Sequence, residues 1–490
     1  MRRRDFLLTA SLAAALPSSI LRPTRRVQAG GAAAGSPTSA DAHFEDMAAL
    51  ITKKMAEYHV PGAALGVIQN DRLTLRGFGV TSVDDSQAIT ADTLFTIASI
   101  SKTFTTTAMM RLVELGRVEL NAPVQKYLPD FRVQDDAASR AVTLRHLLTH
   151  TPGWEGQLTT DDLGVEALAS FASKTMRDVP QLAPPGAVWS YNNAGFALAG
   201  RVIEVVTGQN IHDAIRALVI APLGLAHTFT RLTDAITHRM TLGHREQGGN
   251  TIVLRPFQTT SSVTAGGVMT SITDLMQYAR FHMSDGAGAG GKAFIARARL
   301  AEMQTPQLRK NSTDDEMGVG WHVRTLNGVL TAAHGGTLNG HCLLVQLVPS
   351  RQLAFAILTN HSDGWRLVED VEHALLKSYE GLSLAPNQAI AHRGVNEAMT
   401  THATPLVTQP PVAEYVGTYR HPPLGNIDVH DDAGTLVVGA RNGTTITFYG
   451  PDVAYATTGS SVGSPYEFVR APDGRVGWIR VNGRIAKKDG

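Results

Sequence analysis

The chain has 490 residues, of which 43% are hydrophobic, 18% are charged and 6% are aromatic. That apolar share is sufficient for a large buried core and excludes a chain that is disordered throughout. Lys and Arg number 44 and Asp and Glu number 43, so the net charge of +1 indicates neither a nucleic-acid partner nor a polybasic membrane surface. Cys342 is the one cysteine, which excludes intramolecular disulfides and metal sites built from several cysteines.

Residues 1–29 have the pattern of a bacterial export signal. A basic start with Arg3-Arg4, typical of the twin-arginine pathway, precedes an apolar stretch, and Val27-Gln28-Ala29 is a small-residue cleavage pattern. The apolar stretch, Phe6 to Leu21, is too short and too rich in Ala, Ser and Thr for a stable membrane span. The segment holds six Arg and one Asp, so its removal would leave a net charge of −4. We expect a periplasmic or secreted protein that begins with a spacer over 30–41; the alternative is an uncleaved N-terminal anchor.

Residues 42–380 are expected to form one large domain. The patterns predict helices over 42–58 and 365–379 and strands over 63–69, 73–79, 342–348 and 353–359. Most periodic segments between these two ends are helical. Because each pair of strands is joined by a short turn, the simplest sheet is antiparallel and is built from both ends of the domain, with a helical insert between them. The expected class is α/β in the α+β sense, with helices flanking the sheet.

The rest of the chain predicts a linker and a small β module. Residues 381–411 are rich in Ala, Thr, Pro and Gln and lack periodicity, which is typical of a linker. Residues 412–490 alternate short β-type runs with turns, as expected for a small antiparallel barrel or sandwich. The clearest runs cover 435–438, 445–449, 466–470 and 476–481.

Ser99 and Lys102 form the only S-x-x-K pattern of the chain. They stand at the head of a helical pattern that continues to Leu115 and that Gly116 can end. Three residues apart, the hydroxyl and the ammonium lie on one face of the first turn, where the helix N-terminus and the cation both favour loss of the serine proton. An exposed Ser and Lys one turn apart are commonplace, so the pattern gains meaning only from other elements.

Tyr191-Asn192-Asn193 is the only Y-x-N pattern. In an extended segment or a tight turn, the side chains of Tyr191 and Asn193 project the same way. A phenol has a free pKa of about 10, so Tyr191 can act as a base near neutrality only beside a cation such as Lys102. The alternative is a core tyrosine that caps a helix starting near Ala194.

His334-Gly335-Gly336-Thr337 lies between two β-type runs, 329–333 and 342–348. Two adjacent glycines let a strand backbone approach a ligand closely and direct N–H groups at it. The alternative for His334 is an ordinary turn histidine.

In this order, S-x-x-K, Y-x-N and H-x-G resemble the signature of the serine β-lactamase and penicillin-binding-protein superfamily. The similarity is to its class C-type branch, which includes peptidase family S12 (D-aminopeptidases and DD-carboxypeptidases) and the family VIII esterases. Two further stretches, 143–153 (TLRHLLTHTPG) and 265–281 (AGGVMTSITDLMQYARF), are similar to text common in that branch. The resemblance covers about residues 44–379, and YVGTYR at 415–420 resembles the lipocalin-like C-terminal domains often attached to such enzymes. It implies a β-lactamase/transpeptidase-like fold, no metal and no cofactor.

The resemblance also implies a role for each matching residue. Ser99 would be the acylated nucleophile, and Lys102 would keep both it and Tyr191 partly deprotonated. Tyr191 would be the general base for acylation and would assist the water in deacylation. The backbone N–H groups of Ser99 and Thr337 would form the oxyanion hole, and Asn193 would orient the substrate amide or the lysine head. The expected substrate-binding residues are Asn193, His334, Gly336 and Thr337.

His334 stands where most β-lactamases and DD-peptidases have a lysine. An unperturbed histidine is mostly neutral at pH 7, which predicts weaker selection for a terminal carboxylate. We therefore expect an exported serine hydrolase, either an esterase or a D-specific peptidase or amidase, with a small-molecule or peptide substrate. One alternative is a class C-type β-lactamase or DD-carboxypeptidase, and the other is a non-catalytic protein that binds penicillin or cell-wall fragments.

Three further patterns lack the context that they need. Gly459–Gly463 matches G-x-S-x-G but has no buried strand before it and no helix after it. Gly286–Lys292 nearly matches a P-loop, but it follows a helical pattern and Ala293 stands where Ser or Thr would bind magnesium. His146 and His150 have metal-ligand spacing without a third ligand, which favours hydrogen-bonding histidines.

Overall fold

The computed structural model describes residues 39–158, 164–260, 262–310, 315–383, 404–422, 425–440, 443–459 and 462–489. The predicted export signal, the predicted spacer up to residue 38 and most of the predicted linker lie outside these ranges. None of the helices within them is long and apolar enough to span a bilayer.

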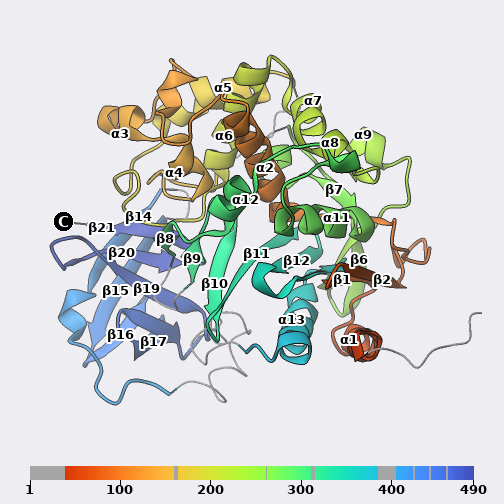
Figure 1. The fold of residues 1–490 in the computed structure, drawn as a ribbon. Coiled ribbons are helices and arrows are strands. Elements are labelled where there is room, and N and C mark those ends of the chain that lie inside the picture. Colours follow the sequence, from red (N-terminus) through yellow and green to blue (C-terminus); the bar gives the residue numbers. More distant parts are fainter. Residues whose placement is uncertain are drawn as a thin grey trace, which may run out of the picture. The chain divides into compact units, whose positions relative to one another are not determined.

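An antiparallel sheet forms the centre of the larger domain (Figure 1), in the strand order β2-β1-β13-β12-β11-β10-β9-β8. Its strands are β1 (Gly62–Gln69), β2 (Arg72–Gly79), β8 (Leu308–Arg309), β9 (Glu316–Met317), β10 (His322–Leu326), β11 (Val329–Leu338), β12 (His341–Val348) and β13 (Leu353–Thr359). β1 pairs with β13 from Ala63 opposite Thr359 to Gln69 opposite Leu353. The predicted sheet built from both ends of the domain is therefore confirmed.

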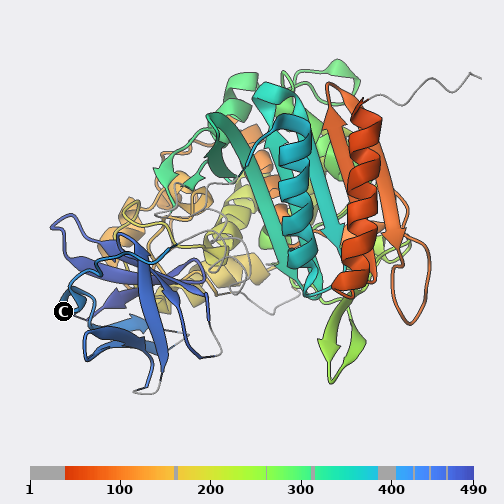
Figure 2. The same ribbon diagram turned by 90° about the horizontal axis from the view of Figure 1, so that it is seen from below.

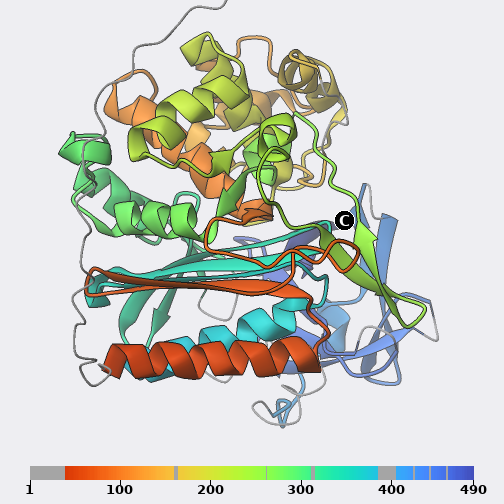
Figure 3. The ribbon, with the colours of Figure 1, turned by 90° about the vertical axis from the view of Figure 1, so that its right-hand side faces the viewer.

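Two helices from the two ends of the domain cover one face of this sheet. α1 (Ser39–Glu57) and α13 (Gly364–Glu380) lie side by side on it (Figures 2 and 3). Their apolar residues, such as Ile51 and Leu375, form one core cluster with Leu65 of β1 and Phe355 of β13. The central strands are buried on both faces, which explains their nearly continuous apolar sequence.

The helical insert covers the opposite face of the sheet (Figure 3). Its helices are α2 (Ser101–Glu114), α3 (Asp136–Ala141), α4 (Leu144–Leu148), α5 (Ala167–Ser173), α6 (Asn193–Thr207), α7 (Ile211–Ile215), α8 (Ala221–Leu223), α9 (Leu232–Ala235), α10 (Ser262–Ala265), α11 (Ile272–Met283) and α12 (Arg297–Gln304). α11 packs directly on β1, where a Cβ at Gly66 would lie 2.5 Å from Cγ of Met276. α2 is buried along most of its length and forms the centre of the insert.

Two small sheets complete the larger domain. β3 (Leu94–Thr96), β7 (Met269–Ser271) and β4 (Thr228–Phe229) pair in that order, and β5 (Gly243–Gln247) forms a hairpin with β6 (Asn250–Leu254). β3 leads directly into the turn that holds Ser99.

The C-terminal strands form a closed barrel in which neighbours follow chain order. They are β14 (Gly417–His421), β15 (Gly425–Asp432), β16 (Thr435–Val438), β17 (Thr444–Gly450), β18 (Val453–Ala456), β19 (Pro465–Arg470), β20 (Val476–Val481) and β21 (Arg484–Lys488). Aromatic and aliphatic side chains such as Tyr419, Phe448 and Ile479 fill its core. The predicted fold class, helices around an antiparallel sheet followed by a small barrel, is confirmed.

Three other stretches were singled out in the sequence: the predicted linker, the P-loop-like stretch and the G-x-S-x-G stretch. In the described part of the predicted linker, the Leu406 N–H donates to the Phe448 carbonyl of the barrel at 2.9 Å. The P-loop-like stretch 286–292 is a turn-rich connection that follows α11 rather than a strand. The G-x-S-x-G stretch includes residues 460 and 461, which lie outside the described residues.

Candidate active site

Ser99 lies in a short 3₁₀ turn, Ala98–Ile100, directly before α2. Ala98 has a positive φ of 47°, a conformation that costs a non-glycine residue about 1–2 kcal/mol, so the backbone is strained next to the serine. β11 passes close to this turn, because a Cβ at Gly336 would lie 3.1 Å from the Ser99 nitrogen and 2.6 Å from the Ile97 carbonyl oxygen. Only glycine at 336 lets the strand and the turn approach each other so closely.

Lys102 is fully buried one turn after Ser99. Its Nζ lies 3.1 Å from Ser99 Oγ and donates a hydrogen bond to the Ala265 carbonyl at 2.7 Å. It also lies over the rings of Tyr191 and Phe196, 4.8 and 5.6 Å from their centroids. Burial, with a smaller contribution from the charge of Arg484, lowers the pKa of Lys102 well below its ordinary value. The side chain is therefore biased toward the neutral amine, which can accept a proton.

Tyr191 reaches Ser99 from the segment before α6. Its hydroxyl donates a 2.7 Å hydrogen bond to Ser99 Oγ. The neighbouring Asn192, not Tyr191, caps α6, since its side chain accepts the Gly195 N–H at 2.7 Å. Burial raises the pKa of Tyr191 to about 12, although the hydrogen bond to Ser99 and the charge of Arg484 act in the opposite direction. The two shifts therefore favour the phenol form of Tyr191 and the amine form of Lys102.

His334 lies on β11 with 1% of its surface exposed. Its Nδ1 contacts the Gly335 carbonyl at 2.7 Å, and its ring centroid is 5.0 Å from that of His322 on β10. Burial and the nearby charge of Lys102 lower the pKa of His334 to about 3. His334 is therefore neutral at physiological pH, and more firmly so than an unperturbed histidine.

The structure brings most of the predicted site residues together. Ser99, Lys102 and Tyr191 form one hydrogen-bonded group, and Gly336 packs against the Ser99 turn. Thr337 follows on the same strand with an exposed side chain that accepts a hydrogen bond from the Trp365 indole. Asn193 is the first residue of α6, and its side chain makes no hydrogen bond to Ser99 or Lys102 among the described residues.

His150 is a buried, hydrogen-bonded histidine, as expected, but its contact with Tyr191 and the neighbouring His322 were not predicted. His150 stacks on Tyr191, with ring centroids 4.6 Å apart, and its Nδ1 accepts the Asn192 N–H at 2.9 Å. His322 in turn stacks on His150 at 6.5 Å. His146, which shares the metal-like spacing with His150, accepts the Thr143 N–H and so caps α4. The part of the chain that the structure describes holds no group of three or more His, Cys, Asp or Glu arranged to bind a metal.

Sequence reasoning also missed Arg484, which comes from the barrel. Its guanidinium carbon lies 5.5 Å from the centroid of the Tyr191 ring, and one of its N–H groups donates to the side-chain oxygen of Gln157. The Asn482-Gly483 turn directly before it is a sequence signal for a tight hairpin that brings it to this position.

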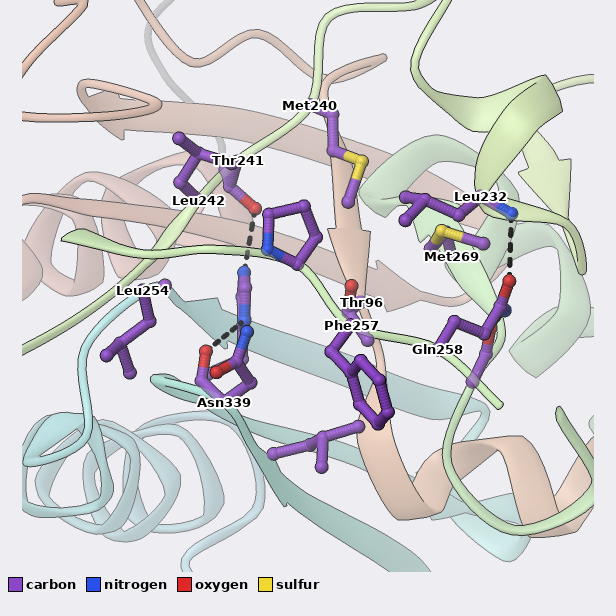
Figure 4. A pocket seen from close by; sticks show the side chains of 15 residues that line it. Thr96, Leu232, Met240, Thr241, Leu242, Leu254, Phe257, Gln258, Met269 and Asn339 are labelled. Carbon is purple, nitrogen blue, oxygen red and sulfur yellow. Dashed lines mark hydrogen bonds between the residues drawn. The ribbon is translucent and has the colours of Figure 1, made fainter. Parts of the chain in front are cut away.

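A pocket, shown in Figure 4, is lined by Thr96 of β3, the strand that leads into the serine turn. Gly267 and Leu338, the residue after Thr337, also line it. The remaining residues that line it are Leu232, Met240, Thr241, Leu242, Gly243, Leu254, Pro256, Phe257, Gln258, Met269, Asn339 and His341.

The surface that this pocket offers is mainly apolar. Several of its polar side chains are already paired with their neighbours: the Thr241 hydroxyl contacts Nε2 of His341 at 3.0 Å, and Gln258 accepts the Leu232 N–H at 2.9 Å (Figure 4). Such a surface favours an apolar ligand group.

Comparisons with known proteins identify the family. Residues 47–378 match the family model described as Beta-lactamase. The chain is 32% identical over 336 residues to Penicillin-binding protein 4 of Amycolatopsis lactamdurans, covering 67% of this chain and 88% of that protein. It is 24% identical over 489 residues to the unguisins hydrolase ungD' of Aspergillus campestris, covering 90% of each.

A solved structure extends the similarity of fold beyond the family match. The structure of SurE has a TM-score of 0.75 and 24% identity to this chain, over 91% of this chain and 99% of that one. The family model and the relatives together identify the family and the type of enzyme. The chain belongs to the Beta-lactamase family and is a serine hydrolase.

Proposed function

We propose that this protein hydrolyses ester or amide bonds through a covalent acyl-enzyme on Ser99. The observation that carries the proposal is the group of three side chains in which Lys102 Nζ lies 3.1 Å and the Tyr191 hydroxyl 2.7 Å from Ser99 Oγ. A nucleophile with a buried base and a second proton carrier in contact is the arrangement that acyl transfer requires.

We assign the proton transfers from the forms that burial favours, the amine of Lys102 and the phenol of Tyr191. The neutral Lys102 amine takes the Ser99 proton as Oγ forms a bond to the substrate carbonyl carbon. The Tyr191 hydroxyl gives its proton to the leaving group as the scissile bond breaks, and it regains a proton from Lys102. The N–H groups of Ser99 and Thr337 would stabilise the oxyanion, each by a few kcal/mol. Water then adds to the acyl carbon, its proton passes to the same base, and Ser99 leaves with a proton.

The substrate side of the proposal depends on His334 and on the apolar pocket. A neutral, buried imidazole offers no fixed positive charge to a terminal carboxylate. We therefore place neutral esters, and amides or peptides of D-amino acids, ahead of β-lactams and D-Ala-terminated peptides. SurE, which shares the fold, has also been solved with D-Leu, and the A. campestris relative is named a hydrolase.

The test combines intact-mass spectrometry with a kinetic panel. Purified protein is treated with a fluorophosphonate and with penicillin, and hydrolysis of short-chain esters, D- and L-amino-acid amides and nitrocefin is measured. We expect an adduct on Ser99, absent in Ser99→Ala, together with turnover of esters or D-amino-acid amides faster than nitrocefin. Faster nitrocefin turnover would assign a β-lactamase or DD-carboxypeptidase, a permanent acyl adduct without turnover a sensor, and no adduct would reject acyl-enzyme chemistry.

We also propose that the protein is exported. The support is the Arg3-Arg4 signal pattern of residues 1–29 with its cleavage pattern at Ala29. Cell fractionation of a bacterial host should place the protein in the periplasm or the medium, and Arg3-Arg4→Lys-Lys should leave it in the cytoplasm.

A further inference from the structure

A hairpin of the barrel reaches the catalytic group. β20 and β21 are joined by Asn482 and Gly483, whose φ values of 50° and 75° are both positive, as in a type I′ turn. A Cβ at Gly483 would lie 3.5 Å from the Trp189 ring and 3.8 Å from Cβ of Tyr191. The turn is thus in contact with the segment that carries the tyrosine.

The hairpin is fixed to that segment by directed hydrogen bonds. The Tyr191 N–H donates to the Gly483 carbonyl at 2.8 Å, and the Ile485 N–H donates to Ser190 Oγ at 3.2 Å. Farther along β20, the Trp478 indole donates to the Leu182 carbonyl at 2.8 Å, and Arg480 donates to the Trp189 carbonyl at 3.1 Å. These contacts place the residue after the turn, Arg484, beside Tyr191.

The guanidinium of Arg484 is only partly used in structural contacts. One N–H donates to Gln157, while Nε is buried and has no acceptor among the described residues. Arg484 and Lys102 both lie over the Tyr191 ring, 5.5 and 4.8 Å from its centroid. Two cationic side chains this close repel each other, and guanidinium keeps its proton where an ammonium does not.

The other titratable groups around Lys102 do not carry a compensating charge. Tyr191 is a phenol with a pKa of about 12, and His334 is neutral with a pKa of about 3. Burial and the charge of Lys102 also lower the pKa of His150 well below its ordinary value. On the barrel side, burial lowers the pKa of Arg484 from its ordinary value, and the charges of Glu155 and Tyr191 act in the opposite direction. A guanidinium stays charged at physiological pH despite such a shift. The Glu155 carboxylate also contacts His421 at 2.6 Å.

We propose that this hairpin completes the active site, and that Arg484 is a positioning residue whose positive charge keeps Lys102 in the unprotonated form that accepts the Ser99 proton. The inference rests on the proposed acyl-enzyme function. It makes the barrel part of the catalytic centre rather than an attached module, because detaching the hairpin would remove both the charge and the backbone contact that holds Tyr191.

The test follows the rate at which a fluorophosphonate labels Ser99, measured by intact mass from pH 5 to pH 10. In this reaction Oγ bonds to phosphorus, fluoride leaves, and the serine proton passes to Lys102, so no natural substrate is needed. In Arg484→Gln we expect the pH of half-maximal labelling to rise by about one unit, with about tenfold slower labelling below it and equal rates at high pH. In Arg484→Lys the new ammonium loses its proton more readily than a guanidinium, so its profile should lie between those of Arg484→Gln and the wild type.

Arg475→Gln is the matched control, since it removes one charge from an exposed barrel arginine that pairs with Asp473. Its profile should equal that of the wild type. If Arg484→Gln lowers the rate equally at every pH, or leaves it unchanged, the inference is wrong while the proposed function stands. If the wild type is not labelled on Ser99 at any pH, the proposed function itself fails. Should Arg484→Gln lose its near-UV circular dichroism, Gln157→Leu is used instead. It removes the hydrogen bond that holds the guanidinium beside Tyr191, and a smaller shift in the same direction is expected.

Discussion

The Tyr191 hydroxyl donates a 2.7 Å hydrogen bond to Ser99 Oγ across 92 residues of sequence. Lys102 completes the group from the first turn of α2, directly after the 3₁₀ turn that holds Ser99. The nucleophile therefore has one neighbour that is local in sequence and one that depends on the fold. The two neighbours differ in protonation, because burial lowers the pKa of Lys102 and raises that of Tyr191. The difference suits Lys102 to accept a proton and Tyr191 to donate one.

Replacing these two neighbours should therefore have different effects. Lys102→Met removes the base, and we expect labelling of Ser99 by a fluorophosphonate to fall by about 10²–10⁴-fold at pH 8. Tyr191→Phe leaves the base, so labelling, in which fluoride leaves without needing a proton from the enzyme, should fall by less than tenfold. Hydrolysis of an amide, whose amine must be protonated as it leaves, should fall by about 10²–10⁴-fold in Tyr191→Phe. Equal losses in both assays would contradict the assignment of Lys102 as the acceptor.

The patterns that could be predicted from the sequence are the local ones. Ser99 and Lys102 are one turn apart, and His334 to Thr337 form one stretch of strand, so their spacing shows in the sequence. The protonation states could not be predicted, since they come from burial by segments distant in sequence. His322 and Arg484 were missed for the same reason: ring stacking on His150 and docking of the barrel hairpin are products of the tertiary fold.

Ester hydrolysis should show no titration of His334. A histidine with its ordinary pKa of 6.5 would give a step in kcat/KM near neutrality, but burial lowers the pKa of His334 to about 3. The ascending limb between pH 5 and pH 10 should instead follow Lys102, whose pKa lies below its ordinary value of 10.5. Activity is present above that pKa and lost as the pH falls and the amine gains a proton. His334→Asn should lower kcat/KM without moving the ascending limb of the pH profile. If the limb disappears in this variant, His334 is not neutral over this pH range.

Introducing the missing charge should change the substrate preference. In His334→Lys, a bound carboxylate would favour the ammonium form of the new side chain over the neutral form that burial favours. The ratio of nitrocefin to neutral ester hydrolysis should therefore rise by about tenfold, the value of one charge contact of about 1.4 kcal/mol. The ratio, taken on one preparation, is independent of the fraction of folded protein. An unchanged ratio would show that the residue at 334 does not select for the carboxylate.

The apolar pocket should determine the preferred acyl chain. Phe257 lines it with 68% of its surface exposed, so it can be replaced without disturbing the core. Phe257→Ser should lower kcat/KM for hexanoyl esters by about threefold to tenfold, the loss of one partly buried apolar contact, and leave acetyl esters unchanged. Ile236→Ser is the control, because Ile236 is similarly exposed, at 62%, but does not line this pocket. Equal losses for both esters in Phe257→Ser would place the acyl chain elsewhere.

Glu372 on α13 should make the stability of the fold depend on pH. It is 5% exposed, and burial raises its pKa to about 7, although the charge of Arg324 acts in the opposite direction. Because the folded-state pKa lies above the ordinary value of 4.5, the stabilisation that comes from the protonated form is complete below about pH 4.5 and is lost as the pH rises through 7. Glu372→Gln, which stays neutral, should exceed the wild type in free energy of unfolding by about 2–3 kcal/mol more at pH 8 than at pH 5. Urea titrations at the two pH values measure this difference, and Glu119→Gln, with a side chain 73% exposed, should show none. A difference that is the same at both pH values would mean that Glu372 is already ionised in the folded protein at pH 5.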